Sequence, residues 1–125
     1  MTQLPTVRAR IDRQGLGSAA EERAAQLLRR AGCDILARNF RCRMGELDIV
    51  ARRGQLLIIA EVRLRSTAKF GGAAASITAA KRARIVRAAR YLLARQPSLT
   101  ALVVRFDTLL LTSSAGPIEW IEGAF

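Results

Sequence analysis

The residues of this chain that are best suited to chemistry are acids that interrupt two apolar segments. Asp48 ends Gly45-Glu46-Leu47-Asp48, and Glu61 opens Glu61-Val62-Arg63 one tight turn later. Only 10 of the 125 residues are acidic, against 21 Lys and Arg, so acids in apolar strands need a specific reason. Because an isolated buried charge is energetically expensive, each such acid needs a partner. A bound cation would supply one.

Hydrophobic periodicity and turn signals predict the elements that hold these acids. Gly32 predicts the end of a first helix with Ser18 as its N-cap, Arg53-Gly54 predicts a hairpin turn, and Pro97 closes a second helix. The predicted order is helix 18–31, strands 34–40, 46–52 and 55–64, helix 77–95, and strands 101–112 and 118–121. This order predicts an α/β domain with a central mixed sheet flanked by helices.

The hairpin turn determines which acids face one another. Pairing across it predicts Glu46 opposite Glu61 and Asp48 opposite Ile59, so that Asp48 lies diagonally beside Glu61. Two-residue alternation adds Arg63 to the same face. Three acids on one face repel one another unless a positive group lies between them.

Mg²⁺ or Mn²⁺ is the natural positive group, because hard divalent ions bind carboxylate and backbone carbonyl oxygens. The carbonyl of Val62 is a candidate third ligand. The alternative is that Arg63, Arg65 or a helix arginine neutralises the acids through salt bridges. Of the three acids, Glu46 is nearest the strand edge, which favours a purely structural role for it.

Each predicted helix directs one charged residue toward the sheet. Glu21 falls within the apolar arc of the first helix, and Lys81 lies between Ile77 and Ile85 on the apolar stripe of the second. Taken singly, an inward Lys or Glu is often a structural partner for the other. Both are expected to face the same acidic cluster.

Composition limits the function classes. A net charge of +11 indicates a polyanionic partner, and nucleic acid is favoured over a membrane surface because the second helix carries only one bulky aromatic residue, Tyr91. The absence of histidine excludes Cys/His zinc sites and histidine-based catalysis. With no signal sequence or membrane span apparent, we expect a cytoplasmic protein with two reduced cysteines. Residues 1–16 are expected to form a mobile basic arm and residues 17–125 a single domain.

Seven segments together resemble the YraN-like family, and the match covers most of the chain. They are Gly17-x-x-x-Glu21-x-x-Ala24, Gly32, Asn39-Phe40-Arg41, Gly45-Glu46-Leu47-Asp48, Glu61-Val62-Arg63-x-Arg65, Lys81 and Arg105-Phe106-Asp107. That family is uncharacterised in function but is similar to Holliday-junction resolvases and to restriction-endonuclease-like PD-(D/E)xK nucleases. The resemblance implies a restriction-endonuclease-like three-layer sandwich.

The resemblance also implies roles for single residues. Asp48 and Glu61 take the places of the two motif acids, and Glu21 that of a first-helix acid near the metal. The motif expects lysine where this chain has Arg63, and an arginine stays protonated and cannot act as a general base. As a catalytic residue, Arg63 would instead orient a water or stabilise the developing charge of a phosphorane. Lys81 is our hypothesis for the replacement of the missing amine.

Three functions follow from these residues. The first is a Mg²⁺- or Mn²⁺-dependent nuclease acting on DNA, with branched or damaged DNA as candidate substrates. The second is a nucleic-acid-binding module of the same fold without catalysis, which the exchange at Arg63 favours. The third is a protein-binding scaffold, which rests only on Trp120 and Phe125 near the C-terminus. The sequence leaves open whether the chain forms a homodimer, as junction-cutting enzymes tend to do.

Overall fold

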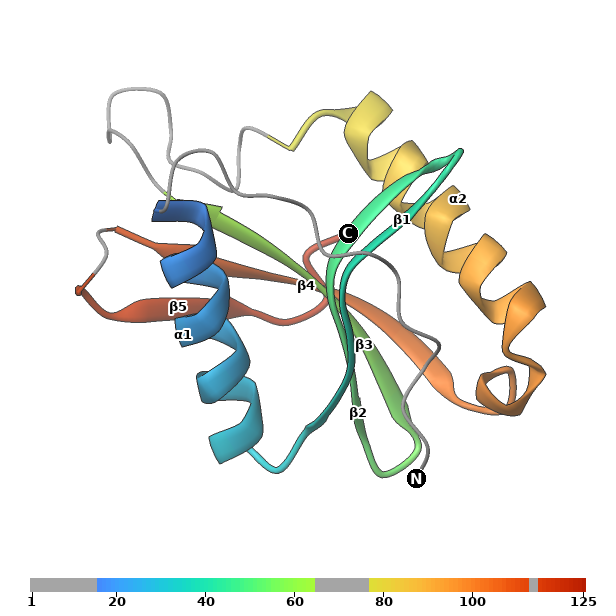
Figure 1. Cartoon of the computed structure of the whole chain (residues 1–125), viewed down its shortest axis with the longest axis horizontal. Coiled ribbons are helices and arrows are strands. Elements are labelled where there is room, and N and C mark those ends of the chain that lie inside the picture. The colour runs from blue at the N-terminus through green and yellow to red at the C-terminus, as the bar shows by residue number, and fades with distance from the viewer. Residues whose placement is uncertain (1–15, 65–76, 113–114) are drawn as a thin grey trace.

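The computed structural model describes residues 16–64, 77–112 and 115–125 (Figure 1). The elements follow the predicted order, with one short 3₁₀ helix added and with boundaries that shift by no more than two residues. They are α1 (Leu16–Arg30), β1 (Asp34–Cys42), β2 (Gly45–Arg53), β3 (Leu56–Leu64), α2 (Ala79–Arg95), η3 (Pro97–Leu99), β4 (Val103–Leu111) and β5 (Ile118–Ile121). The expected N-terminal arm, apart from residue 16, lies outside the described residues, and so does the segment 69–76, whose Gly/Ala-rich sequence predicts a loop.

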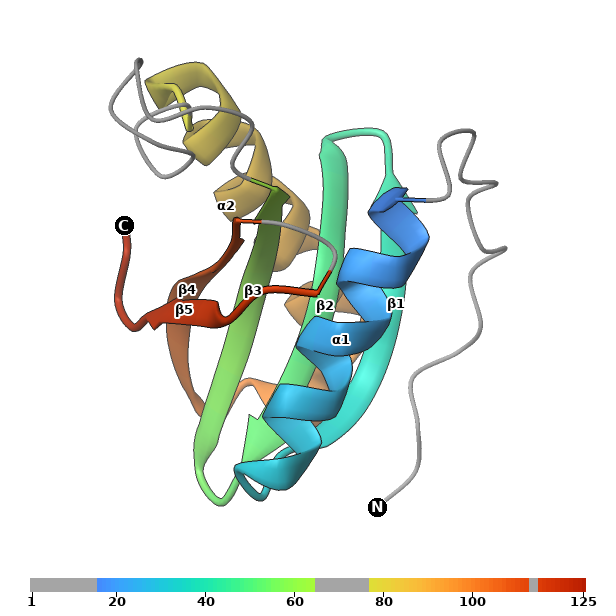
Figure 2. The same cartoon turned by 90° about the vertical axis from the view of Figure 1, so that its left-hand side faces the viewer.

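The five strands form one mixed sheet in the order β1-β2-β3-β4-β5. β3 and β4 are parallel and the other neighbours are antiparallel. A parallel pair needs a long crossover, and α2 provides it between β3 and β4. Figure 2 shows α1 and α2 on opposite faces of the sheet. The predicted α/β architecture is therefore confirmed, and it is consistent with a three-layer sandwich.

Local sequence explains where both helices begin and end. α1 ends in a Schellman motif, in which Gly32 at φ +91° donates to the Arg29 carbonyl and Cys33 to the Leu28 carbonyl. The prediction of Ser18 as its N-cap was wrong, because the helix already begins at Leu16. α2 begins after Thr78, whose hydroxyl accepts a hydrogen bond from the Lys81 backbone N–H at 3.1 Å.

Each face of the sheet has its own hydrophobic core. Between the sheet and α2 the core includes Val50, Leu57, Ile59 and Ile85. Between the sheet and α1 it includes Ile49, Ala51, Ile58 and Leu28. Alternate residues of β2 and β3 thus contribute to opposite cores, as the period of two in a strand requires. No helix in the described part of the chain is long and apolar enough to cross a membrane.

The turn between β2 and β3 differs from the predicted one and changes the register. Arg53 pairs with Leu56, so the turn residues are Gly54 and Gln55. Gly54 has φ +61° at the first central position, where a type II′ hairpin turn favours glycine. The predicted pairing of Asp48 with Ile59 was wrong, because Ile59 pairs with Val50.

Candidate functional site

The sheet opens into a fork between β2 and β3. Their pairing runs from Arg53 and Leu56 only as far as Ile49 and Ala60. Beyond that point β2 stays paired with β1 as far as Gly45, and β3 stays paired with β4 as far as Leu64. Figure 1 shows the two branches, with the β1–β2 tip beside α2 and the end of β3 turned away. Between them lies a cavity of about 550 Å³, which we call the fork hollow.

Acidic side chains line the fork hollow. They come from α1, β2 and β3 and are Glu21, Glu46, Asp48 and Glu61. Asp48 and Glu61 lie where the fork begins, because the register, continued by one residue, would set them opposite each other. Both are deeply buried, with 8% and 4% of their surface exposed. The structure thus brings together the two acids that the sequence singled out.

A local irregularity in β1 and β2 directs Asp48 into the fork. Arg38 pairs with Ile49 and Phe40 with Leu47, but the intervening pair is missing, and Asn39 has φ +54°. Leu47 and Val50 lie in the same core although three positions separate them, so the alternation of β2 is broken at this point. The Asp48 carboxylate accepts a hydrogen bond from the Val62 N–H at 2.9 Å. It therefore bridges the two branches where the backbone ladder stops.

Lys81 lies on the same side of the sheet as Glu61. Its Nζ is 3.3 Å from the Glu61 Oε1, and its side chain keeps 33% of its surface exposed. The prediction that Lys81 faces the acids is thus confirmed. The ion pair is also the structural partnership that the sequence left open as an alternative.

Burial and mutual repulsion disfavour ionisation of the two acids. Burial raises the pKa of Asp48 to about 7, and the Glu61 carboxylate adds to this shift. Burial also raises the pKa of Glu61, although the Lys81 ammonium opposes that rise. The neighbouring Asp48 side chain also opposes the rise in the pKa of Glu61, but burial prevails. Near neutral pH, in the absence of another cation, the pair therefore retains a proton.

The other predicted site residues lie around this pair. Glu21 is buried, with 8% of its surface exposed, and reaches the fork hollow from α1. Val62 and Arg63 line the hollow from β3. The prediction that Glu46 lies opposite Glu61 was wrong, because Glu46 pairs with Arg41 of β1. Glu46 still lines the hollow, and its carboxylate lies 3.9 Å from the Arg41 guanidinium.

Sequence reasoning missed two basic residues and one glycine at the fork hollow. Arg41 and Arg84 line it together with Arg63 and Lys81. Arg84 is three residues from Lys81, a spacing that places both on neighbouring parts of the helix surface and could have identified it. At Gly45, φ is +156° and a Cβ atom would lie 3.2 Å from the Arg84 carbonyl oxygen. Glycine therefore lets the hairpin tip rest against α2.

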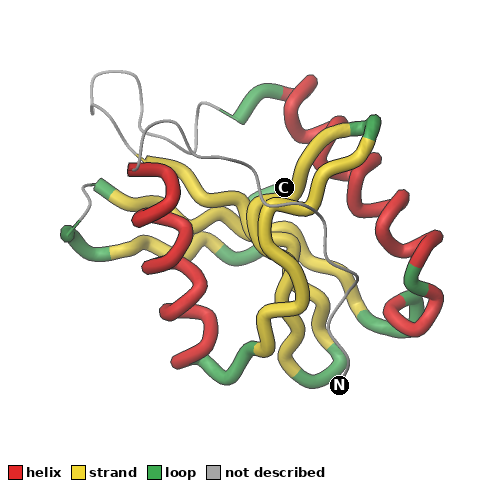
Figure 3. Tube along the Cα trace, viewed as in Figure 1, coloured by secondary structure: helices red, strands yellow, loops and turns green. Residues whose placement is uncertain are grey.

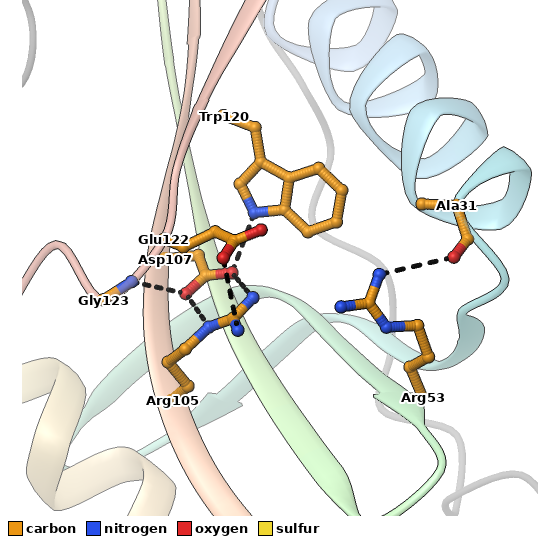
Figure 4. A network of polar contacts seen from close by, with 7 residues as sticks. All are labelled: Ala31, Arg53, Arg105, Asp107, Trp120, Glu122 and Gly123. Atoms are coloured by element: carbon orange, nitrogen blue, oxygen red, sulfur yellow. Dashed lines mark hydrogen bonds and ion pairs between the residues drawn. The ribbon is translucent and has the colours of Figure 1, made fainter.

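The Arg105-Phe106-Asp107 segment has a structural role away from the fork hollow. The buried Asp107 carboxylate accepts hydrogen bonds from Arg105, from the Trp120 indole at 2.8 Å and from the Gly123 N–H at 2.9 Å (Figure 4). Burial opposes ionisation of Asp107, but these hydrogen bonds prevail and lower its pKa. The Phe125 ring stacks on Phe106 at 5.2 Å. The C-terminal aromatics therefore close the domain, which removes the observation that favoured a protein scaffold.

A mixed sheet that forks over a buried pair of carboxylates defines this molecule as an α/β protein with a candidate cation site. The chain belongs to the uncharacterised protein family UPF0102, the YraN family, whose profile matches residues 20–111. The matched segment includes Glu21, Asp48, Glu61 and Lys81. The family resemblance inferred from the sequence is thus confirmed.

Several UPF0102 proteins resemble the chain over most of their length. One from Methylobacillus flagellatus is 47% identical over 111 residues, which are 88% of this chain and 96% of that protein. One from Nitrosomonas europaea is 44% identical over 110 residues, covering 87% and 92%. One from Dechloromonas aromatica is 48% identical over 109 residues, covering 87% of each. The names of these proteins state the family but no reaction.

Proposed function

We propose that the protein is a metal-dependent nuclease that hydrolyses phosphodiester bonds of DNA, with branched or damaged DNA as candidate substrates. The observation that carries the proposal is the convergence of Asp48 and Glu61 at the start of the fork. Two neighbouring buried carboxylates destabilise a fold unless a proton or a cation compensates their charge. The Lys81 ammonium carries one positive charge, which can compensate only one of them. Because Asp48 and Glu61 line a cavity, a cation can reach them, which favours a role as metal ligands over a purely structural role.

The donor atoms suit Mg²⁺ or Mn²⁺. Carboxylate oxygens come from Asp48 and Glu61, and the Val62 N–H already points toward Asp48. Because the N–H and C=O of one strand residue point to the same neighbouring strand, the Val62 carbonyl also faces the fork. The described residues contain no group of three or more acidic, Cys or His side chains suited to a metal. Water would therefore complete the coordination, as is usual for Mg²⁺.

The basic residues around the acids suit a phosphodiester substrate. Arg63, Lys81 and Arg84 line the same hollow and would attract and orient the phosphate group. A divalent cation bound there would supply water of lowered pKa and stabilise negative charge on the phosphoryl oxygens. In the reaction, a water oxygen bonds to phosphorus, one ester P–O bond breaks, and the leaving oxygen takes a proton. The products are a phosphate monoester and a hydroxyl group.

A second candidate is a nucleic-acid-binding module that has lost catalysis. The observation in its favour is Arg63, which stands where the nuclease motif expects a lysine. The Lys81–Glu61 ion pair is compatible with both candidates, because it either positions an amine or neutralises an idle acid. A cleavage experiment separates the two.

The test is cleavage of labelled duplex and four-way-junction DNA with Mg²⁺ or Mn²⁺. We expect the parent protein to cut, and Asp48→Asn and Glu61→Gln to lose activity while retaining DNA binding. Asp34→Asn is the matched control, because Asp34 is exposed at the start of β1 and does not line the hollow. An inactive parent that gains activity with Arg63→Lys would support the binding module instead. Cleavage that survives Asp48→Asn would refute the proposed site.

Metal binding is tested separately by calorimetry with Mn²⁺. The cation must displace the proton that the carboxyl pair retains, so binding should be tighter at pH 8 than at pH 6 and should release a proton. Asp48→Asn should abolish the heat signal. Equal signals from the parent and this variant would place the cation elsewhere.

A further inference from the structure

Four cations recur at every third position of α2. Lys81, Arg84, Arg87 and Arg90 form this series, which we call the α2 cation stripe. Residues three apart are neighbours on a helix surface, and each step of three turns back by about 60°. The stripe therefore winds from the Glu61 carboxylate at Lys81, past Arg84 on the wall of the fork hollow, to Arg87 and Arg90 on the exposed face.

Nothing within the described protein balances the charge of the outer stripe. α2 contains no acidic residue, and its first turn lacks the acids that a helix N-terminus favours. Among the residues that the structure describes, Arg84, Arg87 and Arg90 take part in none of the ion pairs. Like charges at this spacing destabilise a helix. These arginines repel one another and have no acidic partner in the described part of the chain. We therefore expect them to bind an anion from outside the protein.

The tip of the β1–β2 hairpin extends the same basic surface. Gly45 allows the tip to rest on the backbone of Arg84, so the tip and α2 are held together (Figure 3). Arg41 and Arg43 are exposed at the tip. Cations from two elements thus surround one edge of the fork hollow.

We infer that the α2 cation stripe is the path along which the phosphate backbone of one strand of a DNA duplex leaves the fork hollow. This inference rests on the proposed function for the role of the hollow. The nine residue steps from Lys81 to Arg90 rise about 13.5 Å along the helix axis, which is long enough to pass more than one phosphate of a strand. None of the aromatic side chains in the described ranges is exposed, so the surface lacks a platform for stacking unpaired bases. A duplex backbone fits it better than a single strand.

The experiment measures duplex binding against salt concentration in the Asp48→Asn background, without divalent metal, so that no cleavage occurs. Arg87→Gln/Arg90→Gln is compared with Arg29→Gln/Arg30→Gln, which removes the same charge from exposed positions at the end of α1. Each lost phosphate contact lowers the slope of log K against log salt by about 0.9. We expect the α2 double variant to lose about 1.8 in slope and about 60-fold in affinity at 0.1 M salt. The α1 variant should change much less.

Equal losses in the two double variants would overturn the inference, because they would mean that overall charge matters and the stripe does not. So would tighter binding of a single strand of the same length, or no binding of duplex at any salt concentration. A parent protein that binds through the stripe but never cuts would leave this inference standing and refute the proposed nuclease. Cleavage by the parent protein, together with unchanged DNA binding by Arg87→Gln/Arg90→Gln, would support the proposed nuclease and refute this inference.

Discussion

Asp48 combines features that a purely structural acid does not have. Its side chain is almost fully buried, it lies beside the carboxyl of Glu61, which raises its pKa, and it accepts a hydrogen bond from the Val62 backbone. Only the last of these stabilises the charged form, and burial together with Glu61 outweighs it, so the pKa rises to about 7. Ionised Asp48 therefore opposes folding. A buried acid that lowers stability is compatible with the proposed cation, which would need its charge.

Because ionised Asp48 opposes folding, we predict that Asp48→Asn stabilises the metal-free protein above neutral pH. The folded-state pKa of about 7 lies above the ordinary value of 3.8, so the folded protein binds more protons between these pH values, and its stability falls as pH rises through them. Asparagine keeps an oxygen for the Val62 N–H without the charge. We expect a gain on the order of 2 to 4 kcal/mol at pH 8. Urea unfolding in EDTA measures it.

The gain should shrink as pH falls and should approach zero only below the ordinary pKa of 3.8, where Asp48 is protonated in both the folded and the unfolded state. Asp34→Asn, at an exposed position, should change little at either pH. If Asp48→Asn instead destabilised the protein at pH 8, the carboxylate would be a structural group, and the argument for a cation site would weaken.

The acids and the lysine that line the fork hollow were largely predictable, but their relative positions were not. Acids in apolar strands indicated Asp48 and Glu61, and helical spacing indicated Glu21 and Lys81. Their contact depends on a register set by Gly54 at the first turn position and on the missing pair at Asn39. A shift of the turn by one residue moved every predicted cross-strand pair. The shift moves each residue's cross-strand partner by two positions. Because side chains alternate with a period of two, the new partner lies on the same face as the old one, and the hydrophobic pattern cannot distinguish the two registers.

At the level of elements, the contact of the hairpin tip with α2 shapes the fork hollow. We predict that Gly45→Ala destabilises the protein by about 1 to 3 kcal/mol, because its Cβ atom would lie 3.2 Å from a helix carbonyl at φ +156°. Gly54→Ala is the control, since Gly54 has φ +61° but its added Cβ atom would meet nothing within 4 Å. Urea unfolding of both variants separates backbone strain from contact. Equal losses would show that the contact with α2 contributes nothing.

We predict that the neighbouring like charges of α2 lower the stability of the protein. Arg87→Gln/Arg90→Gln removes two like-charge neighbour pairs, 84 with 87 and 87 with 90, and should stabilise the protein by about 0.4 to 1 kcal/mol at low salt. The gain should disappear at about 0.5 M salt, because screening already weakens the repulsion there. Urea unfolding at the two salt concentrations measures it. A loss of stability at low salt would mean that these arginines have partners within the fold.

The helices and strands themselves were predictable, because strong local sequence signals lie close to their observed ends. Gly32 ends α1 and Pro97 follows α2, as expected from their backbone preferences. The start of α1 was misplaced because Ser18 is a good N-cap that the helix does not use. The divergence of β2 from β3 had no signal of its own, since both strands remain paired on their other sides.

Across the described part of the molecule, every buried charged side chain is an acid. Glu21, Asp48, Glu61 and Asp107 are buried, whereas most of the described arginines lie at the surface, and the net charge is +11. This distribution gives a largely basic exterior around buried acids, which is compatible with the proposed phosphate and cation ligands. Composition predicted the exterior. The role of Asp107 was not predictable, because two of its partners, Trp120 and Gly123, lie 13 and 16 residues further along the chain.

Asp107 is therefore the best test of what holds the C-terminal segment on the sheet. In Asp107→Asn the amide would set an NH₂ group against donors from Arg105, Trp120 or Gly123, and we expect a loss of about 2 to 4 kcal/mol at pH 7. The lowered pKa of Asp107 means that the difference from the parent should narrow as pH falls below 4. Fluorescence of Trp120, the single tryptophan, reports the unfolding. Glu122→Gln alters only an exposed contact to Arg105 and should change stability by less than about 0.5 kcal/mol. Equal effects of the two substitutions would mean that the buried network does not hold the segment.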